Sequence, residues 1–223
     1  MQTGHATISR MTRVKVCGIT NIDDAQHALD LGAWAIGLIF HEPSPRACAL
    51  PDAEEIGRRL KRASPEVTGV FVNRPLEEVV AIAEACSLSL LQLHGEEGPA
   101  YCDEAARRTG CKVMKAMQVR DRSSLTALRT FHVDFHLLDA HHPELRGGTG
   151  TTFDWDLIKR RRGVPVVLSG GLTPDNVGDG IAATRPFAVD TASGTEAEPG
   201  RKDPAKLEAF FRAVEQADER AAA

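Results

Sequence analysis

The feature that most constrains the fold of this chain is a series of eight short apolar runs, each of strand length. Val, Leu and Ile fill the runs almost continuously, with little alternation of apolar and polar residues. Strands buried on both faces have this composition, which is typical of a parallel sheet. The runs are 14–18, 34–40, 67–72, 88–94, 111–117, 133–139, 164–170 and 187–192.

Amphipathic segments of helical length follow the runs. Pro75, Pro99, Pro174 and Pro204 stand near the starts of such segments, where a missing backbone N–H costs nothing. The segments are 22–31, 52–62, 75–86, 97–109, 121–131, 154–160, 174–183 and 203–218. Eight βα units in this length favour a closed (β/α)₈ TIM barrel of the α/β class over an open doubly wound sheet.

The chain is predicted to form a single domain. Its 223 residues, 42% of them hydrophobic, suffice for one large core, and no linker or low-complexity tract divides them. Residues 1–13 contain little that can pack, so we expect a disordered tail there, with Met11 as a candidate start residue. The barrel is expected to span residues 14–223.

The net charge and the cysteines limit which partners and which cellular location are expected. A net charge of −4 gives no reason to expect nucleic acid, and no stretch has the length and apolarity of a membrane span. The five cysteines are widely spaced without a CxxC pair, which argues against disulfides or a zinc ribbon and fits a reducing compartment. We therefore expect a cytoplasmic protein that binds a small molecule, and the sequence leaves open whether it is a monomer or a homodimer.

Glycine-rich turns follow the last three runs of the predicted barrel. Backbone N–H groups in such turns can converge on a phosphate, and barrels often bind phosphate after strands 7 and 8. Tight βα turns alone would also use glycine, but three such turns together favour phosphate. The expected contacts are Gly148, Thr149, Gly150, Gly170, Gly171, Ser193 and Gly194.

Cys17 ends the first strand, at the face of a barrel where catalytic groups gather. A thiolate there, favoured by a cation such as Lys15, could abstract a proton. A small buried core residue is the commoner role of a free cysteine. From the residues alone the two interpretations are equally good.

Asp139 ends the sixth strand after the run VDFHLL. Burying a carboxylate unpaired is costly, and apolar surroundings would raise its pKa as a general acid requires. A loop-pinning carboxylate is the alternative. At Asp139 the role of a general acid is favoured over this alternative.

Arg46 lies in a proline-stiffened loop after the second strand, in the segment HEPSPR. Its guanidinium could clamp a carboxylate through two parallel hydrogen bonds, although an exposed loop charge remains the competing interpretation. The pairs His132/His136 and His141/His142 lack the third ligand that a zinc site needs, so no metal is expected.

Several blocks together resemble the phosphoribosylanthranilate isomerase family, in the same order along the chain. The resemblance covers almost all of the chain beyond the tail, and the combination is far more specific than any single block. The blocks are KVCGIT (15–20), FHEPSPR (40–46), GVFVN (69–73), LQLHG (91–95), LLDA…GGTGTTFDW (137–155), LSGGLTPDNV (168–177) and VDTASGTEAEPGRKD (189–203).

The resemblance implies a TIM-barrel isomerase of tryptophan biosynthesis that needs no cofactor. The substrate would be N-(5′-phosphoribosyl)anthranilate and the product 1-(2-carboxyphenylamino)-1-deoxyribulose 5-phosphate, formed by an Amadori rearrangement. By this resemblance Asp139 is the acid that protonates the ring oxygen, Cys17 the base that takes the C2′ proton, and Arg46 faces the anthranilate carboxylate. Thr195, where the family usually has an aliphatic residue, is a small departure.

Three rival functions are weaker. The related aminosugar isomerase of histidine biosynthesis would be expected to carry a carboxylate in place of Cys17. A thiol redox or metal protein should show a resolving cysteine or a ligand triad. A barrel that has lost catalysis would not be expected to keep both Cys17 and Asp139.

Overall fold

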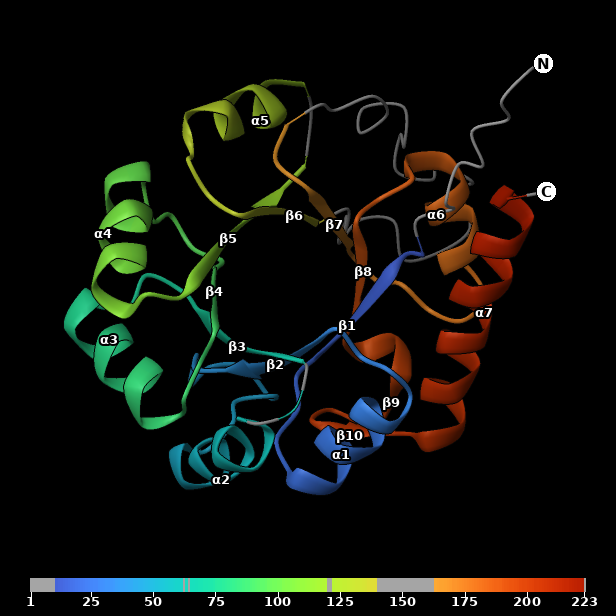
Figure 1. Ribbon diagram of the computed structural model, residues 1–223, viewed down its shortest axis with the longest axis horizontal. Coiled ribbons are helices and arrows are strands. Elements are labelled where there is room, and N and C mark those ends of the chain that lie inside the picture. The colour runs from blue at the N-terminus through green and yellow to red at the C-terminus, as the bar shows by residue number, and fades with distance from the viewer. Residues whose placement is uncertain (1–10, 62, 64, 120–121, 140–162, 223) are drawn as a thin grey trace, which may run out of the picture.

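The computed structural model describes residues 11–61, 63, 65–119, 122–139 and 163–222. Eight parallel strands form one closed barrel in which each strand pairs with its neighbours in the chain and β8 closes on β1. Figure 1 looks into this ring of strands and shows the helices arranged outside it. The strands are β1 Arg13–Cys17, β2 Ala35–Ile39, β3 Glu66–Phe71, β4 Leu90–Leu93, β5 Lys112–Gln118, β6 Phe135–Asp139, β7 Val166–Ser169 and β8 Ala188–Thr191.

The helices on the outside of the barrel agree with the amphipathic segments of the sequence. Asn21 caps the first helix by accepting a hydrogen bond from Asp24 N at 2.9 Å, and Gly110 ends the fourth with a φ of 69°. The helices are α1 Ile22–Asp30, α2 Leu50–Leu60, α3 Leu76–Ala85, α4 Pro99–Thr109, α5 Arg122–Ala127, α6 Val177–Thr184 and α7 Pro204–Ala222.

The single TIM barrel expected from the sequence is confirmed, with differences at some boundaries. Helix α6 begins three residues later than predicted because Thr173 N donates to Asn176 Oδ1 and so forms a turn first. Helix α5 ends early and continues as the 3₁₀ turn η1, Leu128–Thr130. Arg13, assigned to the predicted tail, begins β1. Residues 1–10 and the predicted helix 154–160 lie outside the described residues.

A short segment after β8 was not predicted from the sequence. A 3₁₀ turn, η4 (Ser193–Thr195), leads into the antiparallel strands β9 (Glu196–Glu198) and β10 (Arg201–Lys202). Figure 1 places this hairpin beside α1. Lys202 N donates to Asp24 Oδ2 of that helix at 2.9 Å, so the hairpin is fastened next to the carboxyl end of β1.

The core lies on both sides of the barrel wall. Because side chains alternate along a strand, Val14 and Val16 pack outward with the helices, while Lys15 and Cys17 point into the lumen. The apolar part of the lumen comprises Leu90, Met114, Ala116, Phe135, Leu137, Val167 and Ala188. This alternation decides which polar residues of each strand reach the interior.

Aromatic rings fill the amino end of the lumen. Trp34 lies with its ring centroid 5.1 Å from that of Phe135 and 5.2 Å from that of Phe187. The guanidinium carbon of Arg13 lies 4.4 Å from the centroid of the Phe187 ring. Since this end is filled with apolar groups, polar side chains in the lumen gather toward the carboxyl end.

No helix within the described ranges has the length and apolarity needed to cross a membrane.

Candidate active site

The Cys17 thiol lies at the carboxyl end of β1, with only 5% of the residue exposed. In the barrel wall Cys17 is paired with Gly37 of β2. A Cβ atom built on Gly37 would lie 2.8 Å from Cys17 Sγ, closer than atoms of these kinds approach. The missing side chain of Gly37 is therefore what leaves room for the sulfur.

A buried ion pair lies beneath the thiol. Lys15 Nζ is 2.8 Å from Asp190 Oδ1 of β8, and Ser169 Oγ of β7 donates to Asp190 Oδ2 at 3.1 Å. Burial by itself would lower the pKa of Lys15, but Asp190 and Cys17 outweigh it, and the pKa is raised. Lys15 is therefore a charged ammonium group held by Asp190.

The pKa of the Cys17 thiol depends on burial and on three charged neighbours. Burial raises the pKa of the Cys17 thiol, Lys15 and Lys202 lower it, and Asp190 raises it again; the balance is a raised pKa. Lys15 acts in the expected direction, but its charge is shared with Asp190 and is outweighed by desolvation. Burial therefore favours the protonated thiol, and the role of Cys17 as a base stays a prediction.

Arg46 does clamp a carboxylate, and that carboxylate belongs to the protein. Its Nε donates to both oxygens of Glu196, at 2.9 and 3.0 Å, and its Nη2 donates to Oε2 at 2.8 Å. The stem of Arg46 crosses Gly18, where a Cβ would lie 3.0 Å from Arg46 Cδ. The guanidinium therefore lies next to the residue that follows Cys17.

A second cation shares Glu196. Lys202 Nζ lies 3.3 Å from Glu196 Oε1 and donates to the carbonyl oxygen of Ala192 at 2.9 Å. Burial alone would raise the pKa of Glu196, but Arg46 and Lys202 outweigh it and the pKa is lowered. Burial lowers the pKa of Lys202 despite Glu196.

Asp139 ends β6 and is partly exposed, next to an imidazole. His94 Nε2, just after β4, lies 3.8 Å from Asp139 Oδ2, and the His94 Nδ1 atom lies 2.9 Å from Gln92 Nε2. The side chain of Asp139 is 24% exposed. The apolar surroundings of Asp139 that the preceding run predicted are thus replaced, on this side, by a polar side chain from the loop after β4.

The loop that follows His94 is held by a buried carboxylate. Glu97 accepts hydrogen bonds from Gly95 N at 2.8 Å and Asn73 N at 2.7 Å, and it pairs with Lys115 Nζ at 2.8 Å. These bonds join the loops after β3 and β4 to β5. They set the path of the chain directly after His94.

Two of the three predicted phosphate turns lie against each other. The turn after β7 contains Gly170 and Gly171, with φ values of 109° and 66°. At Gly194 in the turn after β8, a Cβ would overlap the carbonyl oxygen of Leu172. Ser193 precedes it and is exposed. The third turn, with Gly148, Thr149 and Gly150, lies outside the described residues.

Sequence reasoning gave no role to Gly37, Glu196 or Lys202, although the last two stand in a block quoted for the family resemblance. Nothing in local periodicity distinguishes a buried Lys202 from an exposed one. Among the described residues, no three His, Cys, Asp or Glu side chains are grouped closely enough to hold a metal ion.

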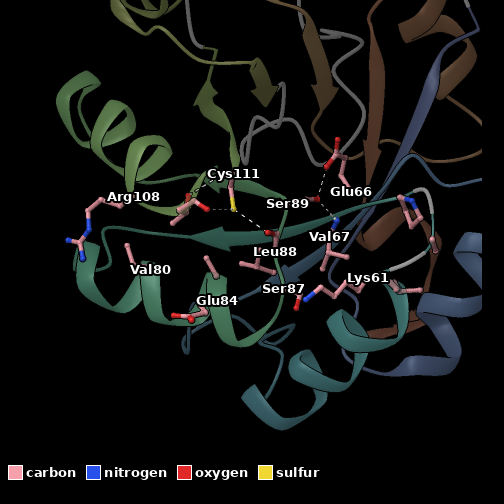
Figure 2. A pocket seen from close by; sticks show the side chains of 15 residues that line it. Lys61, Glu66, Val67, Val80, Glu84, Ser87, Leu88, Ser89, Arg108 and Cys111 are labelled. Atoms are coloured by element: carbon pink, nitrogen blue, oxygen red, sulfur yellow. Dashed lines mark hydrogen bonds between the residues drawn. The ribbon is translucent and has the colours of Figure 1, made fainter.

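A hollow of about 780 Å³ lies at the other end of the barrel. Figure 2 shows Glu66, Ser89 and Cys111 on its inner side, at or just before the starts of β3, β4 and β5. These residues stand at the amino ends of the strands, whereas Cys17 and Asp139 stand at the carboxyl ends. The hollow is therefore separate from the candidate active site.

The closed parallel barrel, with its polar residues at the carboxyl ends of the strands, defines a TIM-barrel enzyme. The family model of N-(5′-phosphoribosyl)anthranilate (PRA) isomerase matches residues 14–213. The chain belongs to the N-(5′-phosphoribosyl)anthranilate isomerase family.

Individual relatives agree with this assignment. The N-(5′-phosphoribosyl)anthranilate isomerase of Geobacter sulfurreducens is 46% identical over 203 residues, covering 91% of this chain and 98% of the relative. The phosphoribosyl anthranilate isomerase structure from Thermotoga maritima has a TM-score of 0.84 and 41% identity, covering 92% and 100% of the two chains. A structure of such an isomerase with reduced 1-(o-carboxyphenylamino)-1-deoxyribulose 5-phosphate has a TM-score of 0.79 and 38% identity over the same fractions.

Proposed function

We propose that this protein converts N-(5′-phosphoribosyl)anthranilate into 1-(2-carboxyphenylamino)-1-deoxyribulose 5-phosphate, an Amadori rearrangement of tryptophan biosynthesis. The observation that carries the proposal is the presence of Cys17 and Asp139 at the carboxyl ends of β1 and β6, in a chain of this family. Both side chains are at inward positions of one lumen. A base and an acid can therefore approach one small substrate from different sides.

The acid step is assigned to Asp139. Its proton passes to the furanose ring oxygen, the C1′–O bond breaks, and the nitrogen lone pair forms the C=N bond of a Schiff base. The carboxylate that remains lies 3.8 Å from His94 Nε2. Gln92 Nε2 lies 2.9 Å from His94 Nδ1 and can donate to it, which would orient the imidazole with Nε2 toward that carboxylate.

The base step is assigned to Cys17. Its thiolate takes the C2′ proton, the C2′–H electron pair forms a C=C bond, and the C=N electrons return to nitrogen. The resulting enolamine becomes the ketone by proton transfer, so no oxidant or reductant is consumed. Lys15 and Lys202 supply positive charge that favours the thiolate against the cost of burial.

The substrate's two anionic ends are assigned to different parts of the mouth. Backbone N–H groups of Gly170, Gly171, Ser193 and Gly194 would bind the phosphate, because the two turns adjoin at Gly194 and Leu172 and glycine has no side chain to obstruct an anion. Arg46 would bind the anthranilate carboxylate. Phosphate soaked into crystals should contact the two turns; amides that point away from any common site would contradict this assignment.

One assay tests the reaction itself. Freshly prepared N-(5′-phosphoribosyl)anthranilate is added to the protein without metal, and the loss of anthranilate fluorescence is followed together with the appearance of the ketose product. The proposal expects turnover well above the rate of spontaneous hydrolysis. Fluorescence that stays constant, or that is lost only by hydrolysis, would refute it.

The proposal extends to the location and assembly of the protein. All five cysteines are free thiols, which supports a location in a reducing compartment such as the cytoplasm. The net charge of −4 supports the proposal that nucleic acid is not a partner, and no membrane partner is proposed. We propose a monomer or a homodimer that needs no cofactor. Sedimentation of the purified protein would decide between the two assemblies, and cell fractionation would test the location.

A further inference from the structure

The guanidinium of Arg46 uses only part of its hydrogen-bonding capacity. The Nε and Nη2 atoms form one edge, and that edge contacts Glu196 through three bonds of 2.8 to 3.0 Å. Nη1 makes no hydrogen bond to any described residue, and the Arg46 side chain is 23% exposed. A guanidinium has five N–H donors in a fixed plane, so the Nη1–Nη2 edge keeps donors for a second carboxylate.

Glu196 is itself held firmly. Its side chain is 5% exposed, and Oε1 accepts from Lys202 Nζ at 3.3 Å and from Gly200 N at 3.4 Å. Its carbonyl oxygen accepts from Lys206 Nζ at 2.8 Å. Movement of this carboxylate away from its partners would separate the buried Lys202 ammonium from the anion that it contacts directly, which is costly.

The other end of the Arg46 side chain is also confined. Its Cδ passes over Gly18, at a distance where any Cβ would touch it. Gly18 directly follows Cys17 in the chain. The stem and one edge of the guanidinium are therefore both restrained next to the candidate base.

The charges of this cluster do not balance. Arg46 and Lys202 are two cations around the single carboxylate of Glu196, which leaves one positive charge. Lys15 and Asp190 beneath them already neutralise each other. With the Cys17 thiol protonated, the cluster can therefore accept one more anion of charge −1, which is the charge of a carboxylate.

We propose that Glu196 is a positioning residue that holds Arg46 so that the Nη1–Nη2 edge receives the carboxylate of the substrate. The inference rests on the proposed function, because it concerns the anthranilate carboxylate of that substrate. Glu196 touches no substrate atom in this arrangement; it acts through Arg46. The alternative is that Glu196 occupies the place of the substrate carboxylate and is displaced by it.

The two arrangements differ in how the protein binds two ligands. One ligand is reduced 1-(o-carboxyphenylamino)-1-deoxyribulose 5-phosphate, and the other is its phenylamino counterpart without the carboxylate. Titration calorimetry gives both dissociation constants for the wild type, Glu196→Gln, Arg46→Ala and the double variant. The wild type should prefer the carboxylated ligand by about 10-fold to 100-fold, the scale of hydrogen bonds to a charged group.

Positioning by Glu196 predicts a specific pattern. Glu196→Gln should lose most of that preference while binding the ligand without the carboxylate as before. In the Arg46→Ala background, Glu196→Gln should have no further effect on the preference. In steady-state assays Glu196→Gln should raise KM more than it changes kcat. Glu104→Gln is a matched control, since Glu104 binds Arg107 through two hydrogen bonds on the exposed side of α4.

Three results would overturn the inference. Tighter or unchanged binding of the carboxylated ligand by Glu196→Gln would mean that Glu196 competes with the substrate or is not needed. Equal weakening of binding for both ligands would mean that Glu196 has a structural role. The same would follow if Glu196→Gln lowered the preference for the carboxylated ligand as much in the Arg46→Ala background as in the wild type. If Glu196→Gln does not fold, Glu196→Gln combined with Lys202→Met keeps one net positive charge and carries the same expectation. A wild type that binds neither ligand would instead refute the proposed function.

Discussion

Lys15 Nζ lies 2.8 Å from Asp190 Oδ1 in the barrel lumen. Lys15 stands two residues before Cys17 on β1. The two residues are direct partners in the closing pair of the barrel, β1 with β8. Because Asp190 takes up much of the charge of Lys15, the thiol above them is exposed to a nearly neutral pair rather than to a bare cation. The proton affinity of Cys17 is therefore sensitive to either member of the pair.

Changing the two members should move the pH dependence of catalysis in opposite directions. The charged groups that act on Cys17 are Lys15, Asp190 and Lys202. Asp190→Asn removes a negative charge, so the pKa of Cys17 should fall and the rising limb of kcat/KM should move to lower pH. Lys15→Met removes a positive charge, so the limb should move to higher pH.

Each of these variants also leaves a buried charge without its partner, which should cost about 3–5 kcal/mol of stability. Urea unfolding measures that cost, and pH–rate profiles measure the shifts. Asp30 is an exposed carboxylate at the end of α1, so Asp30→Asn is the control and should change neither the stability nor the pH–rate profile. If Asp190→Asn and Lys15→Met move the rising limb of the kcat/KM profile in the same direction, damage to the fold rather than charge is responsible.

Replacing the candidate base should remove catalysis with little loss of binding. Cys17→Ala should lower kcat by at least about 10²-fold, the scale of a general base, and leave KM nearly unchanged. Cys111→Ala, at the opposite end of the barrel, is the matched control. Near-normal turnover of the Cys17 variant in the fluorescence assay would end the assignment.

Replacing the candidate acid should keep the fold and lose turnover. Asp139→Asn is nearly isosteric but cannot deliver a proton, so kcat should fall by about 10²-fold to 10⁴-fold. Circular dichroism should show unchanged secondary structure. An Asn variant with normal kcat would mean that the proton for ring opening comes from another source.

Filling the space that Gly37 leaves beside the thiol should displace the sulfur. Gly37→Ala places a Cβ 2.8 Å from Cys17 Sγ, so the sulfur must move, and kcat should fall. Overpacking should also cost about 1–3 kcal/mol. At Gly178 of α6 a Cβ would meet only Ala217 Cβ, at 3.9 Å. Gly178→Ala should therefore keep activity and raise stability by about 0.5–1 kcal/mol, and equal kcat for both variants would contradict the steric argument.

Buried thiols should make the fold less stable at alkaline pH. Burial raises the pKa of Cys48 to about 12 and that of Cys86 to about 11, from an ordinary value of 9.0. Folded thiols therefore keep protons that unfolded thiols lose. Their contribution to stability is complete below pH 9 and declines as the pH rises toward the folded pKa values. Thermal melts from pH 7.5 to 10.5 should show this decline, and Cys48→Ala should reduce its slope; an equal slope would contradict the assignment.

The order of strands and helices was predictable because it depends on local patterns. Continuous Val/Leu/Ile runs indicate strands buried on both faces, and helical segments between them require parallel pairing. Eight such units in one chain favoured the barrel, which the structure confirms. The position of Cys17 and Asp139 at the ends of their strands followed from the same patterns, and the family resemblance gave them candidate roles.

Only the tertiary structure decided what these side chains contact. Arg46 and Glu196 are 150 residues apart in the chain, and Lys15 and Asp190 are 175 apart. Barrel closure joins β1 to β8, and the β9–β10 hairpin brings Glu196 and Lys202 to the same mouth. The sequence by itself determined the fold and which residues reach the carboxyl end of the barrel. The charge around Cys17 and the partner of Arg46 depend on long-range contacts, because periodicity reports which face a residue occupies but not which distant residue it meets there.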